Sequence, residues 1–512
     1  MPPMSAEDDA MALRILLEMR PALDGHGGIP QETRLLFREL SSLQGVRVEG
    51  LLQSSSRMLA RGLPADESKL KRLSLDRRID RLARVVVALE RGAERSNRLM
   101  RLWQAACTLS ATGSMLVEAA MGRRQALGRF EAGSFRDFVW RALFARTLEP
   151  THLDTVTDAG YRVARLPWSA QHFAGLLTRR LGHALYPMLD TTEYDILIAE
   201  TPYPGRVPAG TRMVVRYHDA IPLLMPHTIS NKAHHQASHY EALRRNVRDG
   251  AWFACVSEAT RRDLLSIFPQ AASRAVTIPN IVSEAYRDEP SSPERVAAIL
   301  HTRSNDRVVR RARALAPRSA SLTVGTAGSV DYLLMVSTIE PRKNHLSLLA
   351  AWEQLRAEGR TGLQLVLVGM LGWQSKGILR KLLPWVARGG VHVLDEVPTS
   401  EMRTLYRHAL VTVCPSFGEG FGFSGVEAMR CGGIVAASDL PVHREVYADA
   451  AEYFDPYAVA DLVQSVRRLI DPDSTARREA LARRGAAVAS RYEAAAVLPQ
   501  WQRFLQQVGR AA

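Results

Sequence analysis

The stretch that decides the fold runs from Leu410 to Ala437 and reads LVTVCPSFGEGFGFSGVEAMRCGGIVAA. It begins with a short apolar run that contains β-branched residues, passes through a glycine-rich turn and continues into a segment of small residues that ends at Gly432 and Gly433. This pattern predicts a strand, a loop and a helix. Ser424 and Glu427 have the spacing of a capping box, which predicts that the helix begins at the end of the glycine loop.

The glycine loop of this stretch is suited to binding phosphate or sugar oxygens. Amides at a helix start have no partner within the helix, and glycine lets the backbone approach a ligand closely. Two carboxylates, Glu419 and Glu427, flank the turn. From these residues alone, a helix cap beside a solvated loop explains the pattern equally well.

The length and composition favour a two-domain globular protein. The chain has 512 residues, which is too long for one ordinary core and suits two domains with additions. Its content of 46% hydrophobic and 23% charged residues is typical of globular chains. Four cysteines, at positions 107, 255, 414 and 431, lie far apart with no C-x-x-C pair, so we expect them to be reduced core residues.

The net charge of +14 predicts attraction to polyanions. Zinc-finger spacing, RNA-binding aromatic motifs and a Lys-rich tail are all missing from the sequence, so nucleic-acid binding is the weaker hypothesis. No apolar run reaches the roughly 20 residues that span a bilayer. The N-terminus is acidic and lacks the layout of a signal peptide. We therefore expect a cytoplasmic protein.

The first half of the chain alternates between strand and helix patterns. Strands are predicted at 13–18, 46–52, 195–199, 212–217, 253–256 and 276–278, and the first is followed by a helix at about 31–43. Gly27 and Gly28 come after the first strand, at the edge where open α/β sheets bind ligands. Residues from about 55 to 150 break the alternation. This region is predicted to be helical and basic.

The second half of the chain contains six further strand and helix repeats. Strands are predicted at 332–337, 363–369, 391–394, 411–414, 434–437 and 452–454, which gives a second parallel sheet with a crevice at its carboxyl edge. Gly369 ends the second of these strands. Residues 283–330 are predicted to be an interdomain linker with one helix around 293–315, and an amphipathic helix is expected at the C-terminus.

Charged residues follow two predicted strands. Arg342 and Lys343 precede Asn344, which is placed to cap the next helix, and two cations beside a helix start suit a diphosphate. His218 and Asp219 also end a strand. A histidine there can donate to a sugar hydroxyl, and a neighbouring acid can orient it. Taken alone, a solvated Arg-Lys loop and a structural histidine explain these residues as well.

Four segments resemble retaining glycosyltransferases of family 4. They are the Glu-x7-Glu segment at 419–427 with GFGF inside and EAM at its end, EPRKN at 340–344, HDAIPLL at 218–224, and the run SEATRRDL…IPN at 257–280. The HDAIPLL segment is similar to that of bacterial mannosyl- and rhamnosyltransferases that build surface polysaccharides. Family members usually carry Pro and a larger apolar residue where this chain has Ser424 and Gly425. The resemblance extends over 195–282 and 331–505 and, less closely, over the first 50 residues. It does not cover residues 55–150, and because the usual family core needs no such region, the resemblance implies an insertion that serves the acceptor or the membrane.

The resemblance implies a GT-B architecture, in which two Rossmann-like domains face a cleft. Residues 1–282 would form the acceptor side, residues 331–492 the donor side, and 493–512 a helix that crosses back to the first domain. The implied reaction transfers a hexose, of mannose or rhamnose type, from a nucleotide diphosphate sugar to a saccharide or lipid-linked acceptor with retention of configuration. A GDP-sugar is preferred to a UDP-sugar, and neither a metal ion nor another cofactor is expected.

The resemblance also assigns roles to twelve residues. Arg342 and Lys343 would neutralise the leaving diphosphate, Glu419 would hold sugar hydroxyls, and Glu427 would accept the ribose hydroxyls. The predicted catalytic residues are His218, Glu419, Arg342 and Lys343, and the predicted donor-binding residues are Gly27, Gly28, Asp219, Gly369, Gly420, Phe421, Gly422 and Glu427. No residue identifies itself as a covalent nucleophile, which fits a front-face displacement.

Three alternatives and one membrane hypothesis remain open from the sequence. A sugar-nucleotide epimerase or a pyridoxal phosphate-dependent phosphorylase would have the same GT-B shape, and a polyanion-binding protein would need no donor site. The segment 135–148 carries aromatic residues at helical spacing with arginines beside them. It could form an interfacial helix that attaches the protein to anionic membranes at their inner face, or it could pack on the core.

Overall fold

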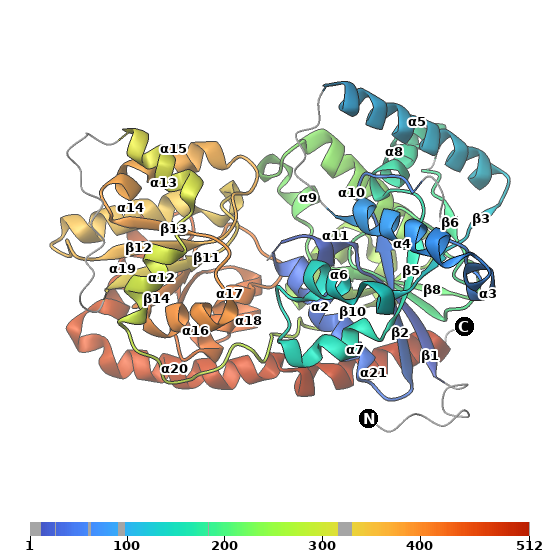
Figure 1. Cartoon of the computed structure of the whole chain (residues 1–512). Helices are drawn as coiled ribbons and strands as arrows, with labels where there is room; N and C mark the ends of the chain where they lie inside the picture. Colours follow the sequence, from blue (N-terminus) through green and yellow to red (C-terminus); the bar gives the residue numbers. More distant parts are fainter. Residues whose placement is uncertain are drawn as a thin grey trace.

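The computed structural model describes residues 12–25, 27–59, 63–90, 98–182, 184–315 and 330–510, and Figure 1 shows them as two α/β domains side by side. Each domain is built on its own mainly parallel sheet with helices around it. The predicted fold class, GT-B with two Rossmann-like domains, is therefore confirmed. The acidic N-terminus and residues 316–329 of the predicted linker lie outside the described residues.

The first sheet has the strand order β10-β9-β8-β7-β1-β2-β5-β4. All its neighbours pair in parallel except β4, which runs antiparallel to β5. The sequence did not predict β4 and β5, which extend the sheet beyond β2. The strands are β1 Leu13–Glu18, β2 Val46–Gln53, β4 Gly128–Phe130, β5 Gly160–Ala164, β7 Ile196–Ala199, β8 Arg212–Tyr217, β9 Trp252–Cys255 and β10 Ala275–Thr277.

The second sheet is parallel throughout and has the order β13-β12-β11-β14-β15-β16. Its strands coincide with the six predicted ones to within about two residues, a normal uncertainty at element ends. They are almost continuously apolar because helices cover both faces of a parallel sheet. The strands are β11 Tyr332–Val336, β12 Gln364–Val368, β13 Val391–Leu394, β14 Val411–Cys414, β15 Val435–Ser438 and β16 Ala451–Phe454.

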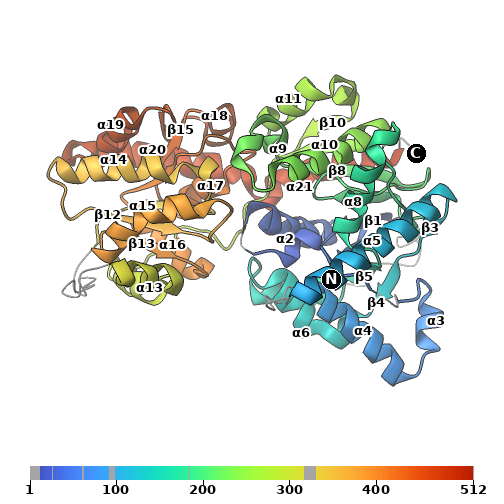
Figure 2. The same cartoon turned by 90° about the horizontal axis from the view of Figure 1, so that it is seen from above.

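Helices surround both sheets, and Figure 2 shows their layers from above. In the first domain they are α2 Gly28–Ser41, α3 Glu67–Lys71, α4 Leu75–Leu89, α5 Arg98–Ala120, α6 Arg136–Phe138, α7 Leu153–Thr157, α8 Trp168–Thr178, α9 Ile221–Leu224, α10 Lys232–Arg248 and α11 Glu258–Ile267. From residue 295 onward they are α12 Arg295–Thr302, α13 Asp306–Leu315, α14 His345–Ala357, α15 Ser375–Ala387, α16 Thr399–His408, α17 Phe423–Arg430, α18 Pro441–Tyr447, α19 Val459–Ile470, α20 Thr475–Ala489 and α21 Ala494–Arg510.

The segment 135–148 is part of the core of the first domain. Val139, Leu143 and Phe144 are fully buried there, in a short π-helical turn at Val139–Phe144 that follows α6. These apolar side chains face the protein interior, so the structure supports core packing, one of the two alternatives for this segment, and membrane attachment stays a prediction. Among the helices that the structure describes, none is both long and apolar enough to cross a membrane.

Arg34 on α2 ties this segment to the loop that follows β1. Its buried guanidinium donates hydrogen bonds to the carbonyl oxygens of Leu143, Ala22, Asp24 and Gly25 and to the Thr147 hydroxyl. Leaving such buried acceptors unpaired would be costly. The contacts therefore hold the end of the 55–150 region close to the glycine turn at residues 27 and 28.

The region predicted to be a linker with one helix holds two, α12 and α13. Val296, Ile299 and Leu300 of α12 pack into the apolar cluster that also contains strands β11 and β15, and Val308 and Ala312 of α13 pack into the other cluster of the second domain. Both helices therefore contribute to the core of the second domain.

The last helix, α21, packs on the first domain, although it follows α20 of the second domain. Figure 1 shows these two helices running along the lower side of both domains. Trp501 is fully buried in the apolar cluster of the first domain, together with Val497, Phe504, Leu505 and Val508. The guanidinium of Arg216 lies 5.2 Å from the centre of the Trp501 ring.

Replacing Trp501 by Ala should destabilise the first domain. A large buried aromatic side chain contributes about 3–5 kcal/mol, so we expect a fall of about 6 °C or more in melting temperature. Differential scanning calorimetry measures it. Gln502→Ala, on the exposed side of the same helix, is the matched control and should leave the melting temperature unchanged. Equal melting temperatures for the two variants would contradict the packing of α21.

Candidate active site

A cavity of about 530 Å³ lies between the two domains, at the carboxyl ends of strands from both sheets. All twelve residues that the sequence predicted for the site line it. Gly27, Gly28, His218 and Asp219 come from the first domain, and the second domain contributes Arg342, Lys343, Gly369, Glu419, Gly420, Phe421, Gly422 and Glu427. The structure thus brings the predicted residues together, and their individual roles stay predictions.

The glycine loop of the second domain touches the first domain directly. A Cβ atom at Gly420 would lie 1.7 Å from the carbonyl oxygen of His218, so only glycine fits at this position. The hydroxyl of Ser257, the N-cap residue of α11, donates to the carbonyl oxygen of Gly420 at 2.8 Å. Gly28 of the first domain also lies against Phe423, the residue that follows the loop.

The capping box predicted at Ser424 and Glu427 does not form. Gly422 is the N-cap residue of α17 and has a φ of 95°, a left-handed conformation that suits glycine. The helix therefore begins at Phe423, and Ser424 lies inside its first turn. Asn344 likewise precedes α14 without capping it, because its side chain donates to the Pro456 carbonyl oxygen instead.

The carboxylate of Glu427 faces the first domain. It accepts one hydrogen bond from Gln31 Nε2 of α2 at 2.8 Å and another from the Tyr406 hydroxyl at 2.8 Å. Burial raises the pKa of Glu427, although both hydrogen bonds oppose this effect. The residue expected to accept ribose hydroxyls is therefore engaged by protein donors on both carboxylate oxygens.

Glu419 is the centre of a compact charge cluster. It forms ion pairs with Lys343 and, at 3.0 Å, with Arg342, and it accepts a hydrogen bond from the Ser416 hydroxyl at 2.6 Å. Burial opposes ionisation of Glu419, but Lys343 and Arg342 outweigh it and hold the pKa of Glu419 well below its usual range. Arg342 also pairs with Glu340 at 2.8 Å. The two cations predicted to bind a diphosphate are thus balanced by two carboxylates.

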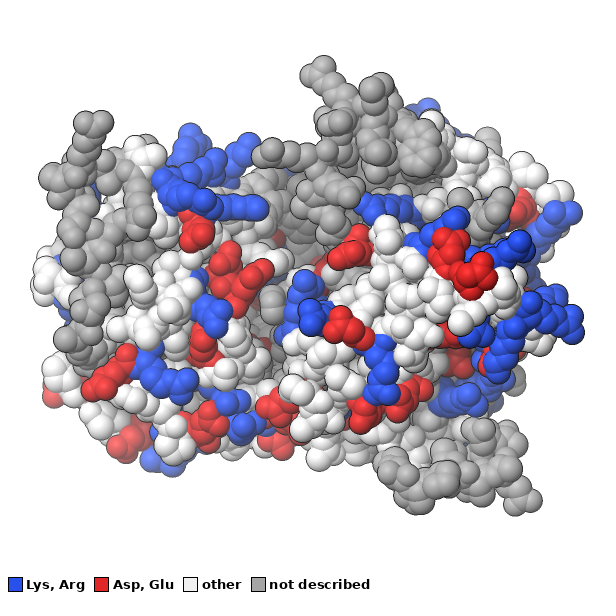
Figure 3. All heavy atoms as spheres, viewed as in Figure 1, with Lys and Arg blue, Asp and Glu red and all other residues white. Residues whose placement is uncertain are grey.

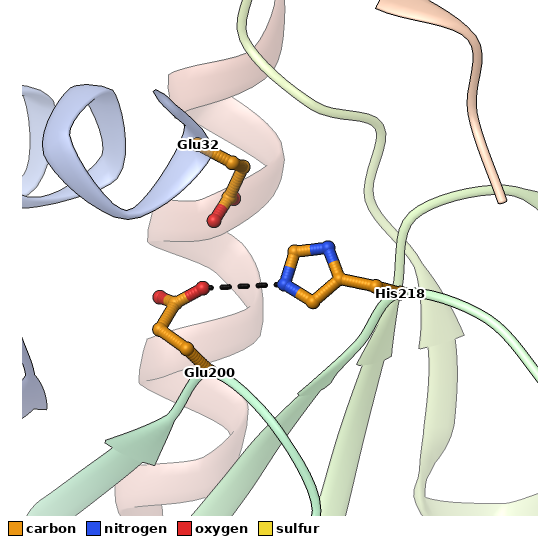
Figure 4. Close-up of side chains that lie close together, drawn as sticks. All are labelled: Glu32, Glu200 and His218. Atoms are coloured by element: carbon orange, nitrogen blue, oxygen red, sulfur yellow. Dashed lines mark hydrogen bonds and ion pairs between the residues drawn. The ribbon is translucent and has the colours of Figure 1, made fainter. Parts of the chain in front are cut away.

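His218 belongs to a second cluster of buried titratable groups, shown in Figure 4. Its Nε2 atom lies 3.3 Å from Glu200 Oε2, and Glu32 of α2 stands above the pair. Burial lowers the pKa of His218 to about 4. Burial also raises the pKa of Glu200 to about 7 and, with help from the charge of Glu200, that of Glu32 to about 8.

These three side chains are the group in the described part of the chain that could hold a cation, since their donor atoms lie within 4.8 Å of one another. However, Arg216 Nε donates to Glu32 Oε1 at 2.9 Å, and this buried guanidinium already places a positive charge beside the carboxylates. The cluster is therefore better suited to sharing a proton than to binding a metal ion.

Several cavity residues were missed from the sequence because no local pattern identifies them. Tyr447 of α18 donates its hydroxyl to the Gly422 carbonyl oxygen at 2.7 Å and so anchors the glycine loop. His443 lies beside it, and Arg146 and Thr147 reach the cavity from the end of the 55–150 region. Their positions depend on contacts between segments far apart in the chain.

A further contact joins the two domains next to the cavity. The carboxylate of Glu445 accepts hydrogen bonds from the backbone amides of Glu258 at 2.6 Å and Ala259 at 2.9 Å. These amides lie in the first turn of α11, where a carboxylate is favoured by unpaired donors and by the helix dipole. The contact helps to hold the glycine loop against the first domain.

Two Rossmann-like domains around a cleft form the GT-B arrangement. Residues 142–286 match the family model described as "Glycosyltransferase Family 4", and residues 325–488 match that described as "Glycosyl transferases group 1". The chain therefore belongs to the glycosyltransferases of the GT-B fold, as its motifs predicted.

Relatives and solved structures agree with this assignment. The chain is 29% identical over 252 residues to O-antigen chain mannosyltransferase B of Escherichia coli, covering 49% of this chain and 59% of that protein. It is 32% identical over 152 residues to the serotype-specific mannosyltransferase WbdA of Escherichia coli, covering 29% of this chain and 18% of that protein. The chain thus spans less than two thirds of the length of either relative.

The structure of sucrose-phosphate synthase from Thermosynechococcus elongatus has the same fold. It superposes with a TM-score of 0.54 at 15% sequence identity, over 98% of this chain and 100% of that chain. At this identity the similarity concerns the arrangement of the two domains.

The raised pKa of Glu32 predicts a pH-dependent stability. Burial raises the pKa of the Glu32 carboxyl to about 8, whereas in the unfolded chain its pKa is near the ordinary value of 4.5. The native state is therefore penalised increasingly as the pH rises between these values. In Glu32→Gln the melting temperature should rise relative to that of the unchanged protein as the pH increases from about 5 to about 9.

Thermal unfolding in a series of buffers measures this difference. Glu49→Gln is the matched control: Glu49 is also buried, but its hydrogen bonds with Tyr194 and Arg162 lower its pKa despite burial. That substitution should therefore lose stability above a pH of about 4.5 rather than gain it. Parallel pH profiles for Glu32→Gln and the unchanged protein would contradict the shifted pKa.

Proposed function

We propose that this chain transfers a hexose from a nucleotide diphosphate sugar to a hydroxyl of a saccharide or lipid-linked acceptor, with retention of configuration. The observation that carries the proposal is that Arg342, Lys343 and the glycine loop line the same cavity as His218. Mannose is the preferred sugar and a GDP-sugar the preferred donor, because the matched relatives are named as mannosyltransferases.

The diphosphate of the donor would bind at Arg342 and Lys343. Glu419 and Glu340 balance both cations, but an ammonium group has three donors and a guanidinium five, so each can also bind a phosphate oxygen. The start of α17 supplies backbone amides and a favourable helix dipole. As the bond to the sugar breaks, charge grows on the diphosphate and these fixed donors would stabilise it.

The donor sugar would lie between the glycine loop and His218. Glu419 is ionised and can accept hydrogen bonds from sugar hydroxyls. It is a poor nucleophile because two cations and the Ser416 hydroxyl already engage its carboxylate. Retention through a front-face displacement requires no covalent intermediate and fits this arrangement.

The acceptor would enter along the wall of the first domain. Arg146 and Thr147 line the cavity close to Gly27 and Gly28, so the 55–150 region takes part in that wall. Two relatives carry O-antigen chain synthesis or serotype in their names, which favours a growing surface polysaccharide as acceptor. We keep the cytoplasmic location as a prediction.

The alternative functions fit the site less well. Lys343 is the lysine that lines the described cavity, and its ion pair with Glu419 makes it unsuited to forming a Schiff base with pyridoxal phosphate. Acidic and basic side chains are mixed over the lower half of the face seen in Figure 3, where they form no continuous basic surface of the kind that a polyanion-binding protein needs.

A direct assay tests the proposed reaction. The protein is incubated with GDP-mannose or UDP-sugars, with and without an oligomannose acceptor, and nucleotide release and product are followed. We expect acceptor-dependent release of GDP and an α-linked product by NMR. Consumption of the donor without acceptor would indicate epimerisation or hydrolysis instead, and an inverted anomeric centre would contradict retention.

Lys343→Met should weaken the binding of a nucleoside diphosphate. Glu419 keeps Arg342 and Ser416 as partners in this variant, but Arg342 alone then faces the two carboxylates Glu419 and Glu340. A charge-assisted hydrogen bond contributes about 1.5–3 kcal/mol, which corresponds to a roughly 10–100-fold loss of affinity for GDP. Isothermal titration calorimetry measures it, with exposed Lys381→Met on α15 as control. An unchanged dissociation constant would remove Lys343 from the diphosphate site.

Glu419→Gln should separate catalysis from nucleotide binding. The variant loses a charged acceptor for sugar hydroxyls, so kcat should fall by about 10²–10³. Affinity for GDP should be equal or higher, because Lys343 and Arg342 lose their competing carboxylate. Steady-state kinetics and calorimetry measure the two effects. A kcat within about twofold of the unchanged enzyme would show that Glu419 does not act on the donor sugar.

A further inference from the structure

Glu200 is a buried carboxylate that the proposed reaction does not yet use. It follows β7 directly, one strand away from β8 and His218, and its side chain is fully buried. Figure 4 shows Glu200 pointing at the imidazole of His218, with Glu32 reaching down from α2. The contact joins Glu200 Oε2 to His218 Nε2 at 3.3 Å.

The surrounding charges determine how many protons this cluster holds. Glu18 on β1 is paired with Arg20 at 2.8 Å, and its other oxygen accepts a hydrogen bond from the Glu200 backbone amide. Arg216 pairs with Glu32 at 2.9 Å. One guanidinium thus faces two carboxylates, Glu32 and Glu200, and one negative charge has no fixed counterion.

Two buried oxygen atoms show where the missing proton belongs. Glu32 Oε2 and Glu200 Oε1 are buried and have no hydrogen-bond partner within the described residues. Glu32 and Glu200 have oxygen atoms within 4.8 Å of each other, so both carboxylates cannot stay charged in this buried site. A proton shared between them satisfies both carboxylates. The proton binds more strongly to Glu32, because the pKa of Glu32 is raised above that of Glu200. Glu200 then stays ionised and accepts a hydrogen bond from His218.

The other ring nitrogen of His218 is open to the cleft. Nδ1 has no hydrogen bond to the described residues, and it is not among the buried atoms that lack a partner. His218 lines the cavity, and its side chain retains 9% exposure. Burial disfavours the imidazolium form, so one nitrogen carries a proton and the other has a free lone pair.

We propose that Glu200 is a positioning residue for His218, whose imidazole it holds as the neutral Nε2–H tautomer with Nδ1 presented to the cleft as a hydrogen-bond acceptor. The inference deepens the proposed function and rests on it, because a sugar hydroxyl is the group that Nδ1 would bind. His218 would then accept a hydrogen bond from a hydroxyl of the donor or acceptor sugar, whereas its place at the end of a strand suggested that it can donate one.

NMR of the full-length protein tests the tautomer without any assay of activity. The chain contains 14 histidines, and His218→Asn identifies the signals of His218 in ¹⁵N and ¹³C histidine-labelled protein. At neutral pH we expect a protonated Nε2 and an unprotonated Nδ1. In Glu200→Gln the Nδ1–H tautomer should appear, because a neutral amide is a weaker acceptor and can itself donate to Nε2. Glu49→Gln should leave the signals unchanged.

Two NMR results would overturn the proposal. One is a protonated Nδ1 or an imidazolium in the unchanged protein at neutral pH. The other is an identical His218 spectrum in Glu200→Gln. Elemental analysis provides a third check: a stoichiometric metal ion that is lost in Glu200→Gln would show that the cluster binds a cation and would also overturn it.

Kinetics test whether the positioning matters for transfer. Glu200→Gln should lower kcat by at least about tenfold, as expected for the partner that orients a histidine. The KM for the donor should change by less than about twofold, and the same substitution in the His218→Asn background should change kcat by less than about twofold. Additive losses would contradict action through His218. If no donor supports transfer, the proposed function fails while the NMR result still decides the role of Glu200.

Discussion

The contact between Gly420 and the His218 carbonyl oxygen is the constraint on which the site depends. The space between these backbones admits no side chain, since a Cβ atom at residue 420 would lie 1.7 Å from that oxygen. Ser257 fixes the contact from the first domain and Tyr447 anchors the loop from the second. Because of this approach, the glycine loop and His218 line one cavity although more than 200 residues separate them in the chain.

Charge balance shapes both walls of this cavity. On the second domain, Glu419 and Glu340 neutralise Arg342 and Lys343, and the cluster is fully charged. On the first domain, Glu32 and Glu200 share one guanidinium, and a proton completes the balance. The first arrangement suits the binding of an anion, and the second suits a neutral histidine that recognises hydroxyls. Buried charges are tolerated here because each has a specific partner.

The sequence predicted the two sheets from local patterns, and the resemblance to family 4 glycosyltransferases, added to those patterns, predicted the residues of the site. Apolar runs identify buried parallel strands, and glycine or charged residues after them mark the ligand-binding edge. The capping box at Ser424 failed because Gly422 adopts a left-handed conformation and starts the helix early. For the segment 135–148, the spacing predicted an apolar face without telling what covers it, so core packing and an interfacial helix both stayed open until the structure showed core packing. The pairing of Glu427 with Gln31 depends on two distant segments and has no local signal.

Both carboxylates of the site, Glu419 and Glu427, already accept hydrogen bonds from protein groups, and this affects how a donor can bind. Glu427 is engaged by Gln31 of the other domain and by Tyr406, and Glu419 by Lys343, Arg342 and Ser416. A donor that uses these carboxylates must therefore exchange hydrogen bonds with the protein instead of filling empty positions. Since the Gln31 contact crosses the cleft, ribose binding at Glu427 would release one link between the domains. Helix α21, which packs on the first domain, and the Glu445 contact with α11 would still hold them together.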